Sequence, residues 1–193
     1  MSDQDITGAT TGPLRVLIVD TTGDKAGFEH AATLKIHKAL LDAGVDVLAP
    51  VFADSMADFL KATEQEFSAL LWVAHGAAPA GETVSSVAIG ATPYAWQLIA
   101  VSGLKLDTKL VALCVCSAGN IDMTVSMQKS DVFALMTVAS SVTLRADEAL
   151  RFFPAFFKKL NPTSTAAIEP QLVKEAVEQL SNLTGNKMRY FGP

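Results

Sequence analysis

The sequence has no apolar run long enough to cross a bilayer, although half of its 193 residues are hydrophobic. A membrane-spanning helix needs about 20 consecutive apolar residues. The first residues, MSDQDITGATTGP, are acidic and polar, and they lack the basic and apolar segments of a signal peptide. We therefore expect a disordered polar leader over residues 1–13, no membrane association, and a protein of the cytoplasm.

Basic residues are too few and too scattered for a nucleic-acid-binding surface. The net charge is −5, and the 15 lysines and arginines form neither a patch nor a stripe. After the leader, the chain also lacks repeats and low-complexity segments, and its length suits one domain with a large core. We expect a single domain over residues 14–193 that does not bind nucleic acid.

Cysteine is scarce, and the two cysteines are Cys114 and Cys116. Thiols stay reduced in the cytoplasm, so a pair this close is rarely a structural disulfide. A metal site is also poorly supported, because the pair and one histidine supply at most three soft ligands. His30 and His37 both fall in the first predicted helix, without an evident route to the cysteines. We expect neither a metal nor another cofactor.

Apolar, β-branched segments alternate with amphipathic ones along the chain. This alternation predicts an α/β domain whose central sheet is mainly parallel and flanked by helices. Nearly all-apolar strands such as SALLWVAHG are typical of a sheet covered on both faces. The strands are expected at residues 14–20, 45–52, 69–75, 109–115 and 132–139, with KMRYFG as an added edge strand.

Two further segments carry specific expectations. ADEALRFFPAFFKKL (146–160) has acidic residues in its first turn and lysines in its last, which suits a helix dipole. Its four phenylalanines are predicted to be core rather than a binding stripe. Residues 77–106 are rich in small and turn-forming types, which predicts a hairpin or ribbon followed by a short helix around YAWQLIAV. We expect this segment to be the least regular part of the domain and to overhang the cleft as a flap.

Two strand ends carry the residues needed for thiol chemistry. His75 follows the strand at 69–75, and Cys116 follows the strand at 109–115. Reactive groups gather at the carboxyl ends of parallel strands, so both side chains emerge at one rim if these strands are neighbours. An adjacent imidazole lowers the pKa of a thiol and later protonates the leaving amine. Gly76 can turn its N–H toward an oxyanion, whereas Cys114 is expected to pack as a small hydrophobe.

The apolar strand ending in AHG, and the later strand ending in LCVCSAG, resemble the caspase-like cysteine peptidases of the CHAT type. This group belongs to the clan of caspases, separases and gingipain-like peptidases. The resemblance continues into DVFALMTVASSVTLRADEALRFFPAFFKKL. It implies a three-layer caspase-like fold and a cysteine endopeptidase acting through an acyl-thioester. Cys116 falls on the nucleophile, His75 on the general base and acid, and the N–H groups of Gly76 and Cys116 on the oxyanion hole.

The sequence departs from the family at one informative position. Relatives specific for basic residues often carry an aspartate two residues before the nucleophile, and this chain has Cys114 there. Asp20, Asp24 and Asp122 are the candidates for lining a substrate pocket.

Domains of the CHAT type commonly lie beside other modules, whereas this chain is nearly a bare domain. The expected partners are a protein or peptide substrate and a regulatory partner chain.

Three alternatives stay open. A glutamine-amidotransferase-like α/β hydrolase normally places its histidine after the cysteine, but all three histidines here precede Cys116. A flavodoxin-like or receiver-like domain would need a phosphate-binding loop or an acidic pocket after the first strand, which DTTGDKAG offers only faintly. A catalytically silent caspase-like module that serves in binding or regulation would share the fold without cleaving peptides.

Overall fold

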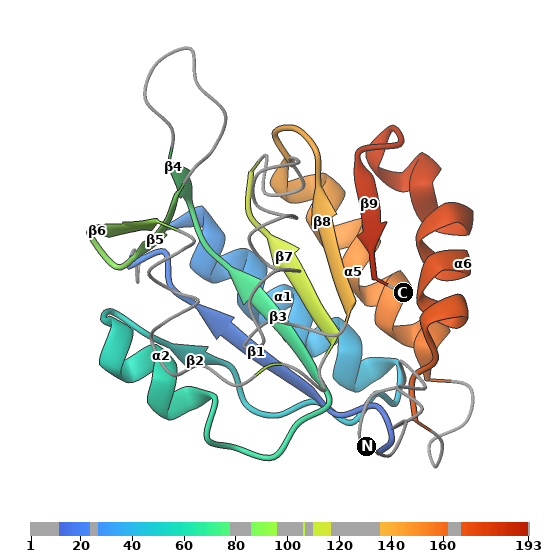
Figure 1. Cartoon of the computed structure of the whole chain (residues 1–193), viewed down its shortest axis with the longest axis horizontal. Coiled ribbons are helices and arrows are strands. Elements are labelled where there is room, and N and C mark those ends of the chain that lie inside the picture. Colours follow the sequence, from blue (N-terminus) through green and yellow to red (C-terminus); the bar gives the residue numbers. More distant parts are fainter. Residues whose placement is uncertain are drawn as a thin grey trace, which may run out of the picture.

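The computed structural model describes residues 12–23, 27–77, 86–95, 106, 110–116, 136–161 and 167–192. Its centre is a six-stranded sheet in the order β2-β1-β3-β7-β8-β9 (Figure 1). All neighbours run parallel except β9, which is antiparallel to β8. The strands are β1 (Val16–Asp20), β2 (Val51–Phe52), β3 (Ala69–Val73), β7 (Leu110–Cys114), β8 (Met136–Ser140) and β9 (Met188–Phe191).

Helices cover both faces of this sheet, so the predicted three-layer α/β architecture is confirmed. Helices α1 and α5 lie behind the sheet in Figure 1, and α2 lies on the opposite face. The two faces have separate hydrophobic clusters, one shared with α1, α5 and α6 and the other with α2. The helices are α1 (Phe28–Asp42), α2 (Met56–Ala62), α5 (Ala146–Leu160) and α6 (Pro170–Leu180), followed by the 3₁₀ turn η1 (Ser181–Thr184).

The central strands are buried along their whole length because both of their faces are covered. Every residue of β1, β3 and β8 is buried. Successive side chains of a strand point to opposite faces: Val16 and Ile18 join the α1 cluster, and Leu17 and Val19 join the α2 cluster. The strand predicted at 45–52 is shorter, since only Val51–Phe52 pairs continuously, with one isolated bridge between Val47 and Val16.

Helix α5 supplies the aromatic part of the core. Its four phenylalanines have no exposed surface, so the prediction that they are core is confirmed. Phe152 packs on Phe153 edge to face with ring centroids 5.3 Å apart, and it stacks on Phe156 at 5.5 Å. Phe157 meets Phe156 edge to face at 5.2 Å. Such pairs stabilise the core by more than their buried area alone.

The first turn of α5 is fastened to the start of β9 through Glu148. This carboxylate accepts a hydrogen bond from the Arg145 backbone N–H at 2.8 Å and from Lys187 Nζ at 2.7 Å. The hydrogen bond from Lys187 is the main reason that the pKa of the Glu148 carboxyl lies below its ordinary value. The contact holds the amino end of α5 against the sheet, close to the carboxyl end of β8.

A second, antiparallel sheet follows β3 and bears on part of the expectation for residues 77–106. It consists of β4 (Gly76–Ala77), β5 (Ser86–Ile89) and β6 (Thr92–Ala95). The predicted hairpin is therefore present at residues 86–95, but it is ordered rather than an irregular flap, because Val87 and Ile89 are buried in the α2-side cluster. Tyr94 and Ala95, expected in a short helix, instead end strand β6. Residues 78–85 and 96–105 lie outside the described part of the chain.

The turn between β5 and β6 requires glycine. Gly90 has a φ of +58°, and its N–H donates to the carbonyl of Thr21 at 2.8 Å. A Cβ at this position would collide with the backbone carbonyl of Asp54. The turn after β1, the segment after β2 and the hairpin therefore pack backbone against backbone.

We expect Gly90→Ala to destabilise the protein more than Gly44→Ala. Gly44 also has a positive φ, of +73°, but a Cβ there would meet no atom within 4 Å. Its substitution should cost about 1–2 kcal/mol from backbone strain alone. Steric overlap should add about 1–3 kcal/mol at Gly90. Urea unfolding of the two variants tests this, and equal losses would mean that the hairpin is not held against Asp54.

Candidate functional site

His75 and Cys116 lie at the same edge of the central sheet because β3 and β7 are neighbours. The two strands pair in parallel, with Val73 opposite Cys114. His75 follows Val73 by two residues, and Cys116 follows Cys114 by two. The ends of both strands lie at the upper edge of the sheet in Figure 1. The sheet register therefore brings the two predicted residues to the same level.

Both residues line one pocket of about 100 Å³ on the face of the sheet that α1 and α5 cover. Seven of the twelve residues that line it have alkyl side chains. Cys114 and Cys116 border it on the β7 side, and His75 borders it on the β3 side. The lining residues are Glu29, Ala32, Thr33, Ile36, Val73, Ala74, His75, Cys114, Cys116, Leu144, Ala146 and Ala149.

The histidine side chain is accessible, while its backbone is held in place. His75 is exposed, and its carbonyl accepts a hydrogen bond from the Ala88 N–H at 2.8 Å. Strand β5 therefore fixes the chain where it leaves β3. The imidazole therefore borders the pocket from an exposed position on an anchored backbone.

Gly76 is the first residue of β4, directly after the histidine. It lies opposite Val87 in the antiparallel ladder. Hydrogen-bonded pairs alternate with non-hydrogen-bonded pairs in such a ladder. Since His75 bonds to Ala88, Gly76 occupies the alternate position, and its N–H points away from β5. An N–H with this orientation can serve as an oxyanion donor, which stays a prediction.

The two thiols lie in different surroundings. Cys116 is half-buried in a turn after β7, and its thiol lies 3.9 Å from the carbonyl oxygen of Leu144, within reach of a weak S–H hydrogen bond. Cys114 packs against the α1-side core cluster. Burial raises the pKa of the Cys114 thiol to about 12, with smaller contributions from Cys116, Asp20 and Glu29. Cys114 is therefore protonated at neutral pH, whereas a thiol attacks as its thiolate.

Asp20 is at the carboxyl end of β1 and is almost fully buried, with 3% of its surface exposed. One carboxylate oxygen accepts hydrogen bonds from the Thr22 N–H at 2.9 Å and the Thr22 hydroxyl at 2.6 Å. The other accepts from the Thr33 hydroxyl at 2.9 Å. This carboxylate joins the turn after β1 to α1. Of the other predicted pocket residues, Asp24 and Asp122 lie outside the described residues.

The acidic residue that lines the pocket is Glu29, in the first turn of α1. Sequence reasoning passed over it because it belongs to a helix rather than to a strand end. The available signal was its position, nine residues after Asp20, since the first turn of a helix that follows a parallel strand lies near the carboxyl edge of the sheet.

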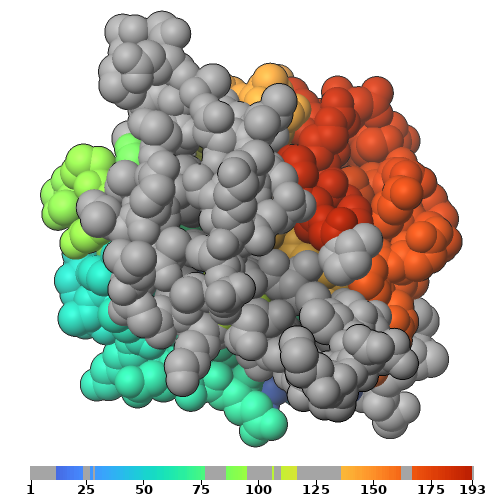
Figure 2. Space-filling view, viewed as in Figure 1, coloured from blue at the N-terminus to red at the C-terminus, as the bar shows by residue number. Residues whose placement is uncertain are grey.

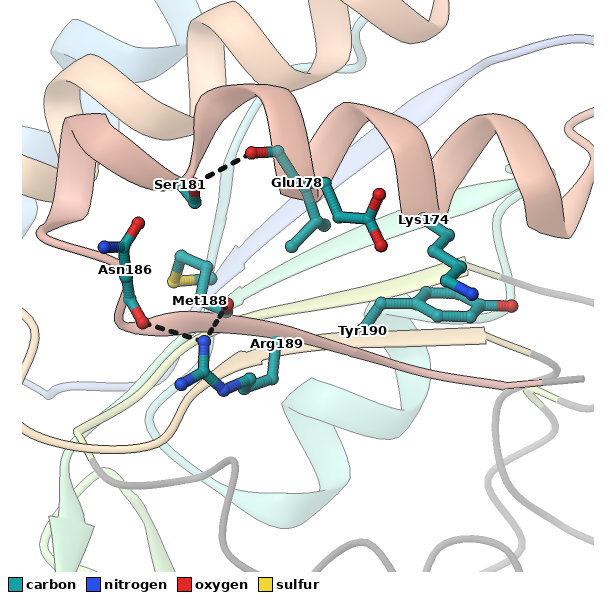
Figure 3. Close-up of a pocket in the computed structure, with 8 residues that line it drawn as sticks. Lys174, Glu178, Ser181, Asn186, Met188, Arg189 and Tyr190 are labelled. Carbon is teal, nitrogen blue, oxygen red and sulfur yellow. Dashed lines mark hydrogen bonds between the residues drawn. The ribbon is translucent and has the colours of Figure 1, made fainter.

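A second hollow of about 420 Å³ lies between α6 and β9 and contains none of the predicted site residues. Lys174 and Glu178 project from α6 toward β9 (Figure 3), and burial raises the pKa of Tyr190. The Arg189 guanidinium donates to the carbonyls of Asn186 and Met188, at 2.8 Å and 3.4 Å. In the space-filling view, α6 and β9 form one continuous side of the surface (Figure 2).

The described residues also bear on other kinds of site. Histidine, cysteine and carboxylate side chains there form no group of three or more that could hold a metal ion. Each helix in the described part of the chain is too short or too polar to act as a membrane span.

Solved structures with a similar fold include a cysteine proteinase and a separase. The chain is similar to the Arg-specific cysteine proteinase gingipain R, with a TM-score of 0.60 and 10% identity over 92% of this chain and 46% of that one. It is also similar to RgpB in the complex of Porphyromonas gingivalis pro- and mature domains, with a TM-score of 0.54 and 11% identity over 92% and 47% of the chains. It is similar as well to a chain of the Saccharomyces cerevisiae separase–securin complex, with a TM-score of 0.53 and 12% identity over 92% of this chain and 12% of that one.

These similarities establish the fold as caspase-like. The chain spans less than half the length of each of these proteins. No protein-family model and no curated protein sequence matches it. The caspase-like part of the expected fold class is therefore confirmed at the level of tertiary structure.

Proposed function

We propose that the chain is a cysteine endopeptidase of the CHAT type that cleaves a protein or peptide through a His75–Cys116 dyad. The observation that carries the proposal is the position of both residues after two adjacent, in-register strands, on one pocket. The fold similarity to gingipain R and separase supports it, because a strand-end histidine and cysteine suit that fold. A regulatory partner chain belongs to the same proposal.

The proposed reaction begins with the Cys116 sulfur attacking the carbonyl carbon of the scissile peptide bond. His75 accepts the thiol proton, and the N–H groups of Gly76 and Cys116 stabilise the negative charge on the oxygen. The tetrahedral intermediate then collapses as His75 protonates the leaving amine. Water attacks the resulting acyl-thioester with His75 as the base, and the carboxylic acid product and the free thiol are released.

The pocket beside Cys116 is the proposed site for the substrate side chain that precedes the scissile bond. Gingipain R is specific for arginine, and Glu29 lines the pocket here. Asp20 already accepts three hydrogen bonds within the fold, so it is less suited to pair with a substrate cation. We therefore assign a preference for a basic residue to Glu29, with Asp24 and Asp122 as further candidates.

Covalent labelling tests the proposed dyad without knowledge of the natural substrate. The probes are peptidyl acyloxymethyl ketones with either arginine or leucine next to the reactive group. We expect the arginine probe to modify Cys116, as located by mass spectrometry. His75→Gln should slow labelling by about 10²–10⁴-fold, the usual contribution of a general base.

The matched control is His37→Gln, which removes a half-buried imidazole from α1 without touching the pocket. This variant should be labelled at the wild-type rate. Equal labelling of both histidine variants would refute the dyad. Absence of labelling and of peptide cleavage, even with a partner chain present, would favour the silent binding module.

A further inference from the structure

The side chains of Cys114 and Cys116 lie on the same side of the chain at the end of β7. Side chains two residues apart in a strand share a face. Val115, between them, is buried in the α2-side cluster, whereas Cys114 packs on the α1-side cluster. Both cysteines border the same small pocket, and neither is in a disulfide. The proposed reaction uses only one of the two sulfurs.

The Cα spacing expected for the pair lies within the range found in disulfides. Residues i and i+2 of an extended strand have Cα atoms about 6.6 Å apart, and disulfides form up to about 6.8 Å. The chain bends at Val115 and turns at Cys116, so the pair is not held in the geometry of an ideal strand. The charge of Cys116 is also among the causes that raise the pKa of Cys114, as is expected of two sulfurs that lie close together.

We propose that Cys114 is a resolving cysteine, and that a hydroperoxide converts the pair into a reversible Cys114–Cys116 disulfide that blocks the nucleophile. The formation of this bond does not depend on the proposed peptidase activity. Its consequence, the loss of activity under oxidation, rests on the proposed function.

The chemistry proceeds in two balanced steps. The Cys116 thiolate attacks the peroxide, the O–O bond breaks, and a sulfenic acid forms as the hydroxide or alkoxide leaves and takes up a proton. The Cys114 sulfur then attacks the Cys116 sulfur, the S–O bond breaks, and the thiol proton leaves with the hydroxyl as water. The peroxide is reduced by two electrons, and the two thiols are oxidised to one disulfide.

The different surroundings of the sulfurs decide the order of these steps. Cys116 is half-buried in the turn after β7 and borders the pocket, and peroxides react with thiolates. Cys114 stays protonated at neutral pH, so it reacts slowly with free peroxide. Its proximity to the sulfenic acid makes the second step intramolecular, which compensates for its low nucleophilicity. Closing the disulfide also protects Cys116 from further oxidation to sulfinic acid.

Intact-mass measurement of the full chain after treatment with hydrogen peroxide tests the proposal, with N-ethylmaleimide used to count free thiols. The wild type should lose two hydrogen atoms and both thiols together, and dithiothreitol should restore both. Cys114→Ser should instead gain two or three oxygen atoms on Cys116. Cys116→Ser should react more than about tenfold more slowly than the wild type, because a protonated thiol is a poor nucleophile.

Three results would overturn the proposal. These are oxygen gain instead of hydrogen loss in the wild type, a disulfide between two chains, and no reaction with peroxide. The wild-type measurement needs no variant to fold and no substrate. Formation of the disulfide in a chain that cleaves no peptide would therefore refute the proposed function alone. Peptide cleavage that persists in the fully oxidised chain would refute the proposed switch alone.

Discussion

Cys116→Ala should abolish peptide cleavage, with a loss of at least about 10⁴-fold in kcat, as is usual when a catalytic nucleophile is removed. Cys114→Ala should reduce kcat/KM by less than about tenfold, because that thiol is protonated and makes no bond to the substrate. The measurement is steady-state hydrolysis of a fluorogenic peptide with arginine before the scissile bond. Both variants keep the strand and differ only in which sulfur is lost.

The difference in activity between Cys116→Ala and Cys114→Ala shows which cysteine is the nucleophile and which only packs against the core. Cys114→Ala removes a sulfur from the edge of the core, which should cost stability by about 1–2 kcal/mol, in the usual range for point substitutions. Thermal unfolding of both variants shows whether a loss of activity reflects unfolding. Equal losses of activity in two folded variants, or electrophile labelling confined to Cys114, would show that Cys116 is the wrong choice of nucleophile.

Phe156→Ala in α5 should be among the most destabilising single substitutions in the protein. The ring has no exposed surface and contacts both Phe152 and Phe157. Removing a buried phenylalanine costs about 3–5 kcal/mol, because transfer free energy is lost and a cavity remains. For a domain of this size, each kcal/mol corresponds to about 2–4 °C in Tm. Differential scanning calorimetry should therefore show a decrease of roughly 6–20 °C.

Leu41→Ala is the matched control, since Leu41 lies on α1 with 52% of its surface exposed. Its substitution should change stability by less than about 0.5 kcal/mol. Labelling of Cys116 well below the Tm should be unchanged in Phe156→Ala, because α5 meets the pocket only at its first turn, through Ala146 and Ala149. A quadruple alanine variant of the phenylalanines that stays soluble and stably folded would contradict the core role of α5.

Local sequence patterns were sufficient to predict the elements that carry the site. Buried strands such as β3 and β7 are nearly all apolar, and helix α5 combines acidic and basic ends with an aromatic face. Both are properties of consecutive residues. The positions of His75 and Cys116 after two of these strands can be read directly from the sequence.

Local patterns were insufficient where long-range contacts decide the outcome. The hairpin at residues 86–95 was predicted, but its small and turn-forming residues did not indicate that it would be ordered. It is ordered because Val87 and Ile89 enter a core built from β1, β3 and α2, and because Gly90 fits against Asp54. Strand β2 is short because it is an edge strand, paired only with β1.

The sequence by itself determined the type and order of the elements, and the two residues with thiol chemistry at strand ends. The tertiary structure alone decided that β3 and β7 are adjacent and in register, which brings His75 and Cys116 to one pocket. It also decided that the Asp20 carboxylate accepts hydrogen bonds from Thr22 and Thr33, whereas Glu29 lines that pocket. Hydrophobic periodicity acts over neighbouring residues, whereas strand order and the docking of a helix on a sheet depend on contacts between residues far apart in the chain.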